Sequence, residues 1–272
     1  MTIRLRAAAA IAATLFASAA SAGPFILAGT DADDHGFANA LGNQEGWLFM
    51  QKAIENIAAG SSLTTSNKVV VSLGSSGDAL TAAQSAFNLS SLAGAGGWTF
   101  LSVANLTAAN FATSIASAGI IMLDSGGNVD GGLTDVEELV LTTNASALDS
   151  FVGSGGGLFS QAGDYGWLSS LVPGLNRVSF SNTGLTLTAA GSAAFPGLND
   201  SDLSAGPWHN NFTGVGSIPV LATGIGNRAV IIGSSGGSIS DPIPAIPEPS
   251  TYALMALGLA GMAAVARRRK SA

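Results

Sequence analysis

Short apolar runs alternate with amphipathic stretches over the first two thirds of the chain. The runs at 69–71 and 120–123 contain no polar residue and predict strands that are buried on both faces. Between such runs, apolar residues recur at spacings of three and four, as in the segment 47–58, which predicts a helix. The predicted strands are 24–28, 68–73, 98–103, 119–124 and 158–160, and the predicted helices are 47–58, 78–87, 107–117 and a long one from residue 134. Alternating strands and helices predict a parallel sheet with right-handed crossovers.

The long helix has a clear start signal. Thr134-x-x-Glu137 is a capping box, in which each side chain bonds the backbone N–H of the other residue. We expect the apolar side of this helix to carry Val136, Leu139 and Val140.

Beyond residue 177 the pattern changes to short β-like pieces. These pieces, at 177–180, 185–188, 218–222 and 229–232, predict an antiparallel extension of the sheet. Residues 238–246 are rich in proline and predict a linker. The predicted fold is therefore α/β: a flavodoxin-like parallel sheet with helices on both faces and a β-rich C-terminal extension, in one domain over residues 23–237.

The N-terminal segment has the composition of a secretory signal peptide. Arg4 and Arg6 precede an apolar stretch at 7–17, and Ala20-Ser21-Ala22 fits a cleavage site with small residues. We expect signal peptidase to remove residues 1–22, so that the protein is exported.

The C-terminal end has three parts in a fixed order. Pro247-Glu248-Pro249 precedes an uncharged run at 251–266, and Arg267-Arg268-Arg269-Lys270 follows it. Sixteen helical residues span about 24 Å, somewhat less than a hydrocarbon core of about 30 Å. Basic residues at one end stay on the cytoplasmic side. The run at 251–266 therefore predicts a short transmembrane helix with the rest of the chain outside.

This order of parts, over residues 247–272, resembles a PEP-CTERM sorting signal. The resemblance implies that the exported chain is held at the inner membrane, is cut there by the protease exosortase, and then reaches the cell surface or the extracellular space. The alternative is an ordinary C-terminal membrane anchor. A polysaccharide matrix outside the cell is a further partner that such a location would offer.

Charge and cysteine content exclude several functions. From Asp31 to Glu248 the chain has four basic residues and all 17 acidic ones, a formal charge of −13. Such a surface cannot neutralise phosphates, so nucleic-acid binding is excluded. The chain has no cysteine, which excludes disulfides, thiolate metal sites and a cysteine nucleophile.

Three segments have a recognisable order: the loop 30–36 with its histidine, the glycine-rich run 149–163, and the segment 208–212. Together they resemble the class I glutamine amidotransferase-like superfamily, in particular its ThuA-like branch. The resemblance implies a nucleophile at the end of the strand near residue 160. This chain has Gln161 there, and an amide is not a nucleophile. The resemblance therefore implies a domain that has lost its glutaminase chemistry.

Two groups of residues are candidates for a site. Asp31, Asp33, Asp34 and His35 follow the first strand, and three carboxylates with an imidazole could hold a divalent cation, the one cofactor that the sequence suggests. The alternative is a solvated loop in which the aspartates cap turns. Asp124, Gln161 and His209 would open into the same crevice, with His35, His209 and Asp124 as the candidate acid–base groups.

Two functional hypotheses follow. The first is an exported envelope or matrix protein with a non-catalytic α/β domain, whose crevice is vestigial or binds a small ligand. The alternative is a metal-assisted or carbohydrate-processing enzyme that uses the Asp and His residues of the crevice. If the crevice is catalytic, His35 and His209 should converge in one pocket.

Overall fold

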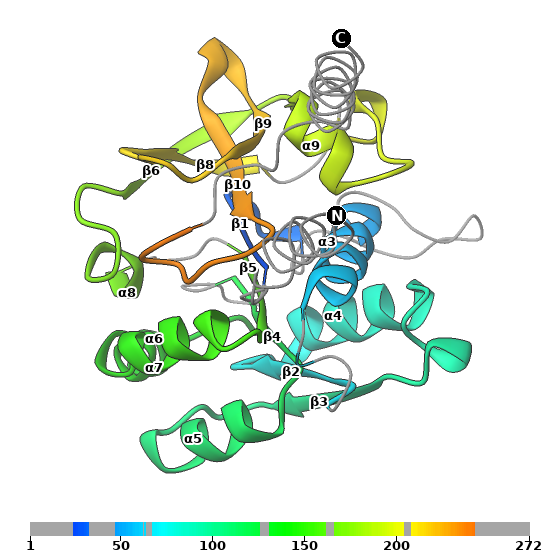
Figure 1. Ribbon diagram of the computed structural model, residues 1–272, viewed down its shortest axis with the longest axis vertical. Coiled ribbons are helices and arrows are strands. Elements are labelled where there is room, and N and C mark those ends of the chain that lie inside the picture. The colour runs from blue at the N-terminus through cyan, green and yellow to red at the C-terminus, as the bar shows by residue number, and fades with distance from the viewer. Residues whose placement is uncertain are drawn as a thin grey trace, which may run out of the picture.

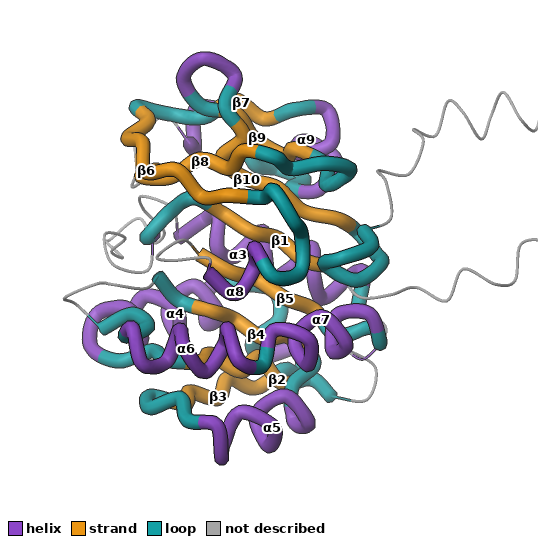
Figure 2. Tube along the Cα trace, turned by 90° about the vertical axis from the view of Figure 1, so that its left-hand side faces the viewer, coloured by secondary structure: helices purple, strands orange, loops and turns teal. Residues whose placement is uncertain are grey.

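The computed structural model describes residues 24–32, 47–61, 63, 67–125, 131–161, 166–203 and 208–242. Within these residues ten strands form one mixed sheet, and helices cover both of its faces (Figures 1 and 2). The predicted signal peptide, the predicted sorting tail and the predicted helix 251–266 all lie outside the described residues. Among the helices that are described, none combines the length and the apolar character that a membrane span needs.

The elements alternate as the apolar pattern predicts. The strands are β1 (Phe25–Ala28), β2 (Val69–Leu73), β3 (Thr99–Val103), β4 (Ile120–Leu123), β5 (Gly157–Gln161), β6 (Asn176–Asn182), β7 (Thr186–Leu187), β8 (Trp208–Thr213), β9 (Val220–Thr223) and β10 (Ala229–Ser234). The helices are α3 (Trp47–Gly60), α4 (Gly77–Leu89), α5 (Ala108–Ser117), α6 (Asp135–Thr143), α7 (Ala145–Gly153), α8 (Gly166–Ser169) and α9 (Ala189–Ala194).

One half of the sheet is parallel. Its strands lie in the order β3-β2-β4-β5-β1, and each neighbouring pair is parallel. If β2 is counted as strand 1, the strands β3, β2, β4 and β5 lie in the order 2-1-3-4, as in a flavodoxin-like sheet. Strand β1 takes the fifth place, beyond β5, although it comes first in the chain. The crossover from β1 to β2 therefore passes β5 and β4.

The other half is antiparallel, as the β-rich texture beyond residue 177 predicts. Strand β10 pairs with β1, β8 with β10, and β6 with β8, all antiparallel, while β9 joins β10 to β7. The pattern did not predict β8, because its sequence Trp-His-Asn-Asn-Phe-Thr has too many polar residues for an apolar run. Pairing on both sides supplies the backbone hydrogen bonds that allow this strand to be buried.

Two hydrophobic clusters pack on opposite faces of the sheet. Helices α3 and α4 cover one cluster, which includes Ile54 and Phe87, and α5, α6 and α7 cover the other, which includes Phe111 and Leu148. Figure 1 shows α3 and α4 on one side of the sheet and α6 and α7 on the other. The two faces are called the α3 face and the α6 face below.

The long helix predicted from Thr134 is two helices, and its predicted apolar side is wrong at two of three positions. Val140 packs against the cluster of the α6 face, as predicted, whereas Val136 and Leu139 face outward. The chain leaves the helix at Asn144, between α6 and α7. Val136 and Leu139 are 71% and 64% exposed, whereas Glu137 is buried. The capping box explains this orientation, because the Glu137 carboxylate accepts hydrogen bonds from the Leu106 N–H at 2.8 Å and from Thr134. Those bonds turn Glu137 toward the protein and the neighbouring apolar residues outward.

The first part of the predicted linker is packed on the domain. Ile239 is fully buried in the cluster of the α6 face. The Ser240 N–H and hydroxyl both donate to the carboxylate of Asp149 on α7, at 2.9 and 2.7 Å. Gly237 also pairs with Pro242. The folded part of the chain therefore extends at least to residue 242.

Candidate functional site

The candidate residues lie along the edge of the sheet where the parallel strands end, called the carboxyl edge below. Leu123 pairs with Ser160, so the residues that come next on the two strands, Asp124 and Gln161, lie side by side. Gln161 also pairs with Ala28, the last residue of β1. Residues that pair in a parallel sheet point to the same face, and Ala28 belongs to the cluster of the α3 face. Asp124 and Gln161 are therefore neighbours on that face.

Asp124 forms a buried polar network with two serines. The Ser72 hydroxyl donates to Oδ2 of Asp124 at 3.1 Å, and the Ser72 and Ser75 hydroxyls are hydrogen-bonded to each other. All three residues are fully buried. The chain leaves β2 for α4 on the α3 face and leaves β4 for α6 on the other face. In an open α/β sheet, ligands bind at the point where adjacent strands connect to opposite faces. The network lies at this point.

Gln161 is a regular strand residue with an unpaired side chain. In the described segments, Asn227 is the one non-glycine residue with positive φ, so Gln161 does not sit in a strained elbow. Its side chain is 2% exposed, and neither amide atom has a hydrogen-bond partner within the described chain. A buried amide in this state lacks the bonds that it would make in water.

Three more unpaired polar groups lie on the α3 face. They are the Trp47 indole N–H, the Gln51 amide nitrogen and the Trp208 indole N–H, all buried and without a partner in the described residues. Trp47 and Gln51 are one turn apart on α3. Phe49 of the same helix contacts both Trp208 and Phe159 of β5, with ring centroids 5.7 and 5.8 Å apart.

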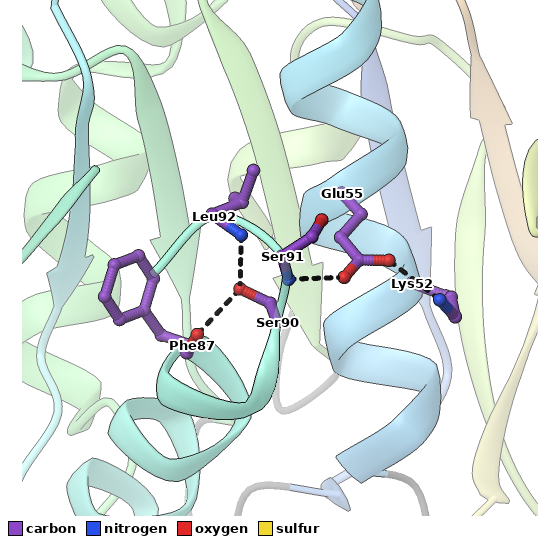
Figure 3. Close-up of polar contacts among 6 residues, drawn as sticks. All are labelled: Lys52, Glu55, Phe87, Ser90, Ser91 and Leu92. Atoms are coloured by element: carbon purple, nitrogen blue, oxygen red, sulfur yellow. Dashed lines mark hydrogen bonds and ion pairs between the residues drawn. The ribbon is translucent and has the colours of Figure 1, made fainter. Parts of the chain in front are cut away.

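One turn further along α3, the side chain of Glu55 has partners for both of its carboxylate oxygens. The Glu55 carboxylate accepts a hydrogen bond from the Ser91 N–H at 2.7 Å and pairs with Lys52 at 2.9 Å (Figure 3). Burial raises the pKa of Glu55, but the bonds from Ser91 and Lys52 outweigh that effect and hold the pKa below its usual value of 4.5. Gln51 and Glu55 therefore lie on the same helix, but only Glu55 has hydrogen-bond partners for all of its buried polar atoms.

Asp31 and His209 are brought together at the end of β1. His209 Nε2 lies 3.4 Å from Oδ1 of Asp31, and both side chains remain partly exposed. The contact depends on Gly29, whose carbonyl accepts a hydrogen bond from the Asn210 N–H. A Cβ at Gly29 would collide with the Asn210 carbonyl, so only glycine allows β8 to approach this closely. A carboxylate beside an imidazole can transfer or hold a proton.

The other members of the predicted metal cluster, Asp33, Asp34 and His35, lie outside the described residues. Within the described ranges, no group of three or more His, Asp or Glu side chains is arranged to hold a metal ion. The structure therefore brings Asp31 to His209 and places Asp124 and Gln161 on neighbouring strands, and it leaves the convergence of His35 and His209 a prediction. Ser72 and Ser75 belong to the Asp124 network, and the sequence did not single them out.

The basic side chains of the described chain are all engaged elsewhere. Lys52 pairs with Glu55, and Lys68 donates to the Gly96 carbonyl. Arg177 donates to Oδ1 of Asn210 at 2.8 Å, and the Arg228 guanidinium lies 3.9 Å from the centre of the Phe180 ring. None of them is left to neutralise an anion at the carboxyl edge.

Comparison with protein families identifies a PEP-CTERM protein-sorting motif at residues 245–270. This motif indicates an exported protein that is anchored to the membrane while exosortase processes it. Comparison with curated proteins and with solved structures finds no match. The motif begins three residues after the last described residue of the domain, so it concerns delivery and not the folded domain.

Proposed function

We propose that this chain delivers a non-catalytic α/β domain to the cell surface or the extracellular matrix. In this proposal signal peptidase removes residues 1–22, the helix 251–266 holds the exported chain in the inner membrane, and exosortase cuts near Pro247-Glu248-Pro249. The single observation that carries the proposal is the sorting motif at 245–270, which follows the folded domain directly.

The positions of the two processing junctions support this arrangement. Phe25, at the start of β1, pairs with Ser234, at the end of β10. Both chain ends of the domain therefore leave from the amino edge of the parallel strands, opposite the carboxyl edge. Asp149 fixes the last turn of the domain through Ser240. A domain tethered in this way presents its carboxyl edge away from the membrane.

The chemistry of the domain supports a binding or structural role. The chain has no cysteine, and Gln161 offers no nucleophile. Gln161 also lies within a regular strand. The resemblance to ThuA-like domains stays a prediction, and so does the loss of a nucleophile that it implies.

Mass spectrometry of the mature protein tests the proposal. We expect a chain that begins near Gly23 and ends near Pro247 in the surface or medium fraction, and an uncut, membrane-bound chain in cells that lack exosortase. An intact chain in the cytoplasm of normal cells would refute it.

The absence of cysteine allows a direct test of orientation. Ser154→Cys marks the amino edge and Asn105→Cys the carboxyl edge, and both positions are exposed. With the uncut chain in vesicles that contain spin-labelled lipid, a fluorophore at residue 154 should be quenched more strongly than one at residue 105. Equal or reversed quenching would contradict the proposed orientation.

A second candidate function rests on the pair formed by Asp31 and His209. Their separation of 3.4 Å suits a metal-assisted or carbohydrate-processing enzyme with an acid–base pair. The mature protein would then turn over glycosides, esters or amides in a hydrolase screen, and Asp31→Asn would abolish that turnover without lowering Tm. A screen without turnover, with and without added calcium or zinc, favours the non-catalytic role.

A further inference from the structure

The sheet has two outer strands, and their sequences differ. Figure 1 shows β3 and β6 at opposite ends of the sheet, and within the described residues each pairs on one side only. Strand β6 carries Arg177, shifts its register against β8, and has the Arg228 guanidinium over its Phe180 ring. Charged side chains and irregular pairing protect an outer strand from pairing with another chain. Strand β3, Thr-Phe-Leu-Ser-Val, has no charge and no proline, and it pairs regularly with β2 at five positions.

The outer side of β3 has backbone groups that no described residue pairs. The Thr99 N–H donates to the Lys68 carbonyl, at the start of the pairing with β2. Alternate residues of a paired strand direct their N–H and C=O groups to opposite sides, so the odd-numbered residues of β3 bond β2 and the even-numbered ones point outward. The outward residues are Phe100 and Ser102, and no described residue bonds their N–H or C=O groups. The outer side therefore offers two donors and two acceptors to another strand.

The part of the chain that contains β3 is uncharged. Residues 79–123 cover most of α4 and all of β3, α5 and β4, and they contain no Asp, Glu, Lys or Arg. Two carboxylates reach this part of the chain, Glu55 at the Ser91 N–H and Glu137 at the Leu106 N–H, and both are engaged by these bonds. The rest of the domain is acidic, so its net charge makes two copies repel each other. The uncharged end is where a second copy meets the least repulsion.

We propose that the mature protein forms a two-fold dimer in which β3 pairs antiparallel with β3 of a second copy. Outward residues exchange hydrogen bonds in an antiparallel pair, so Phe100 of each copy would bond Ser102 of the other. Leu101 would then lie on the two-fold axis, at a non-hydrogen-bonded position where facing side chains are closest. Leu101 is 46% exposed in the single chain, and its own copy would cover it. The two Lys68 side chains, beside the start of each β3, would lie at opposite ends of the pair.

This inference goes beyond the proposed function, because β3 belongs to the folded domain and not to its processed ends. A second copy fits the strand better than an acidic or basic partner does. The strand has no charge to attract such a partner, whereas two copies of β3 match each other in hydrogen bonds and in their exposed leucine.

The absence of cysteine allows the register to be tested with single substitutions. Leu101→Cys would place two thiols at a pair with Cα atoms about 4.5 Å apart, within the range that a disulfide spans. Mild oxidation of this mature variant should give a covalent dimer. Thr99→Cys, exposed on the same strand, should not, because its two copies would be about 14 Å apart. Val178→Cys, 42% exposed on β6, is the control at the other end of the sheet and should stay monomeric under oxidation.

Analytical ultracentrifugation of the mature protein measures association without a cross-link. We expect the wild type to form a dimer over a concentration series, with a Tm that rises with concentration. Leu101→Lys would bring two like charges together on the axis and should raise the dissociation constant at least tenfold. Since Leu101 is partly exposed, this variant should still fold, with a Tm close to that of the wild-type monomer. Val178→Lys should dimerise like the wild type.

Several results would overturn the inference. They are a wild type that stays monomeric throughout the series, a dimer that Leu101→Lys leaves unchanged, and equal cross-linking of Thr99→Cys and Leu101→Cys. Loss of the dimer in Val178→Lys would mean that β6 takes part, and would also overturn it. Cross-linking of Leu101→Cys to a different protein in place of a second copy would do the same. A protein that is cut and delivered normally but stays monomeric refutes this inference alone, whereas a chain that cross-links through Leu101→Cys but is never cut refutes the proposed function alone.

Discussion

The two edges of the parallel sheet are built differently. At the amino edge polar groups are paired: the Leu158 N–H donates to the Pro24 carbonyl, and Ser240 donates twice to Asp149. At the carboxyl edge, the Gln161 amide is buried without a partner in the described chain. Phe25 at the start of β1 and Ser234 at the end of β10 both lie at the paired edge. The unpaired amide thus lies at the opposite end of the parallel strands from the two ends of the domain.

Helix α3 connects the two edges and shows the difference over a single turn. Glu55 is held by Ser91 and Lys52, whereas the Gln51 amide nitrogen has no partner in the described residues. Both residues lie on α3, so helix propensity does not explain why only Glu55 is fully paired. What differs is the neighbouring backbone: the loop after α4 donates an N–H to Glu55, whereas no group of the described residues pairs with the Gln51 amide nitrogen.

The largest effect should come from Gly29→Ala, which disrupts the carboxyl edge. The new Cβ would collide with the Asn210 carbonyl, a backbone atom that cannot move without shifting β8. We expect a loss of about 3 kcal/mol in the free energy of unfolding, measured by chemical denaturation. Gly166→Ala is the control, because its Cβ would meet nothing closer than the Thr142 hydroxyl at 3.8 Å. Equal stability of the two variants would mean that β8 does not depend on this close approach.

Glu137→Ala tests the part of the carboxyl edge that is fully paired. The substitution leaves the Leu106 N–H without its acceptor and removes the Glu137 half of the α6 capping box, while the Thr134 cap itself remains. We expect a loss of about 2–3 kcal/mol by chemical denaturation, because one variant removes both the acceptor of a buried N–H and one half of a capping box. Asp135→Ala, exposed in the same turn, should lose less than about 1 kcal/mol. A rise in stability for Glu137→Ala would show that this carboxylate, like Gln161, lacks adequate partners.

The contrast between edges also explains how much of the molecule could be predicted. Strands β2 and β4 are apolar throughout or nearly so, and local periodicity identifies them. The place of β1 beyond β5 could not be predicted, because it depends on pairing between residues more than 100 positions apart. The polar strand β8 could not be predicted for the same reason, since its burial depends on β6 and β10.

The candidate site follows the same rule. Asp124 could be predicted because it directly follows a buried strand, and Gln161 because it lies at the end of one. The sequence could not show that Gln51 is buried, since a glutamine beside an apolar helix face is common and its burial depends on tertiary packing. The one available signal was its spacing, four residues after Trp47 and three before Ile54, which places it within the buried side of α3. The same argument from spacing failed for Val136 and Leu139, because the capping box rotated that helix.

Asp149→Ala should loosen the amino edge by a smaller amount. It removes both hydrogen bonds to Ser240 at the surface, so we expect a loss of about 1 kcal/mol. Amide hydrogen exchange should rise at Ser240 and Asp241 and stay unchanged at Gln161. Ser146→Ala on the exposed side of α7 is the control. If exchange at Ser240 does not change, the end of the domain is held by Ile239 alone.

The smallest effect concerns Glu55 and appears only as a function of pH. Because the pKa of Glu55 in the folded chain is lower than its usual 4.5, the ionised carboxylate favours folding. That contribution is fully present above the unfolded pKa and is lost as the pH falls through the lowered folded pKa. Glu55→Gln should therefore reduce stability by less than about 1 kcal/mol at pH 7, since the pair is partly exposed, and the difference from the wild type should shrink below about pH 4.

Gln51→Glu tests the same comparison at the other position of the helix. A carboxyl placed there has no N–H to receive, so its folded pKa should rise, and acid should stabilise this variant relative to the wild type. Parallel pH profiles for the two variants would mean that these two positions of α3 do not differ in the way that the hydrogen bonds indicate.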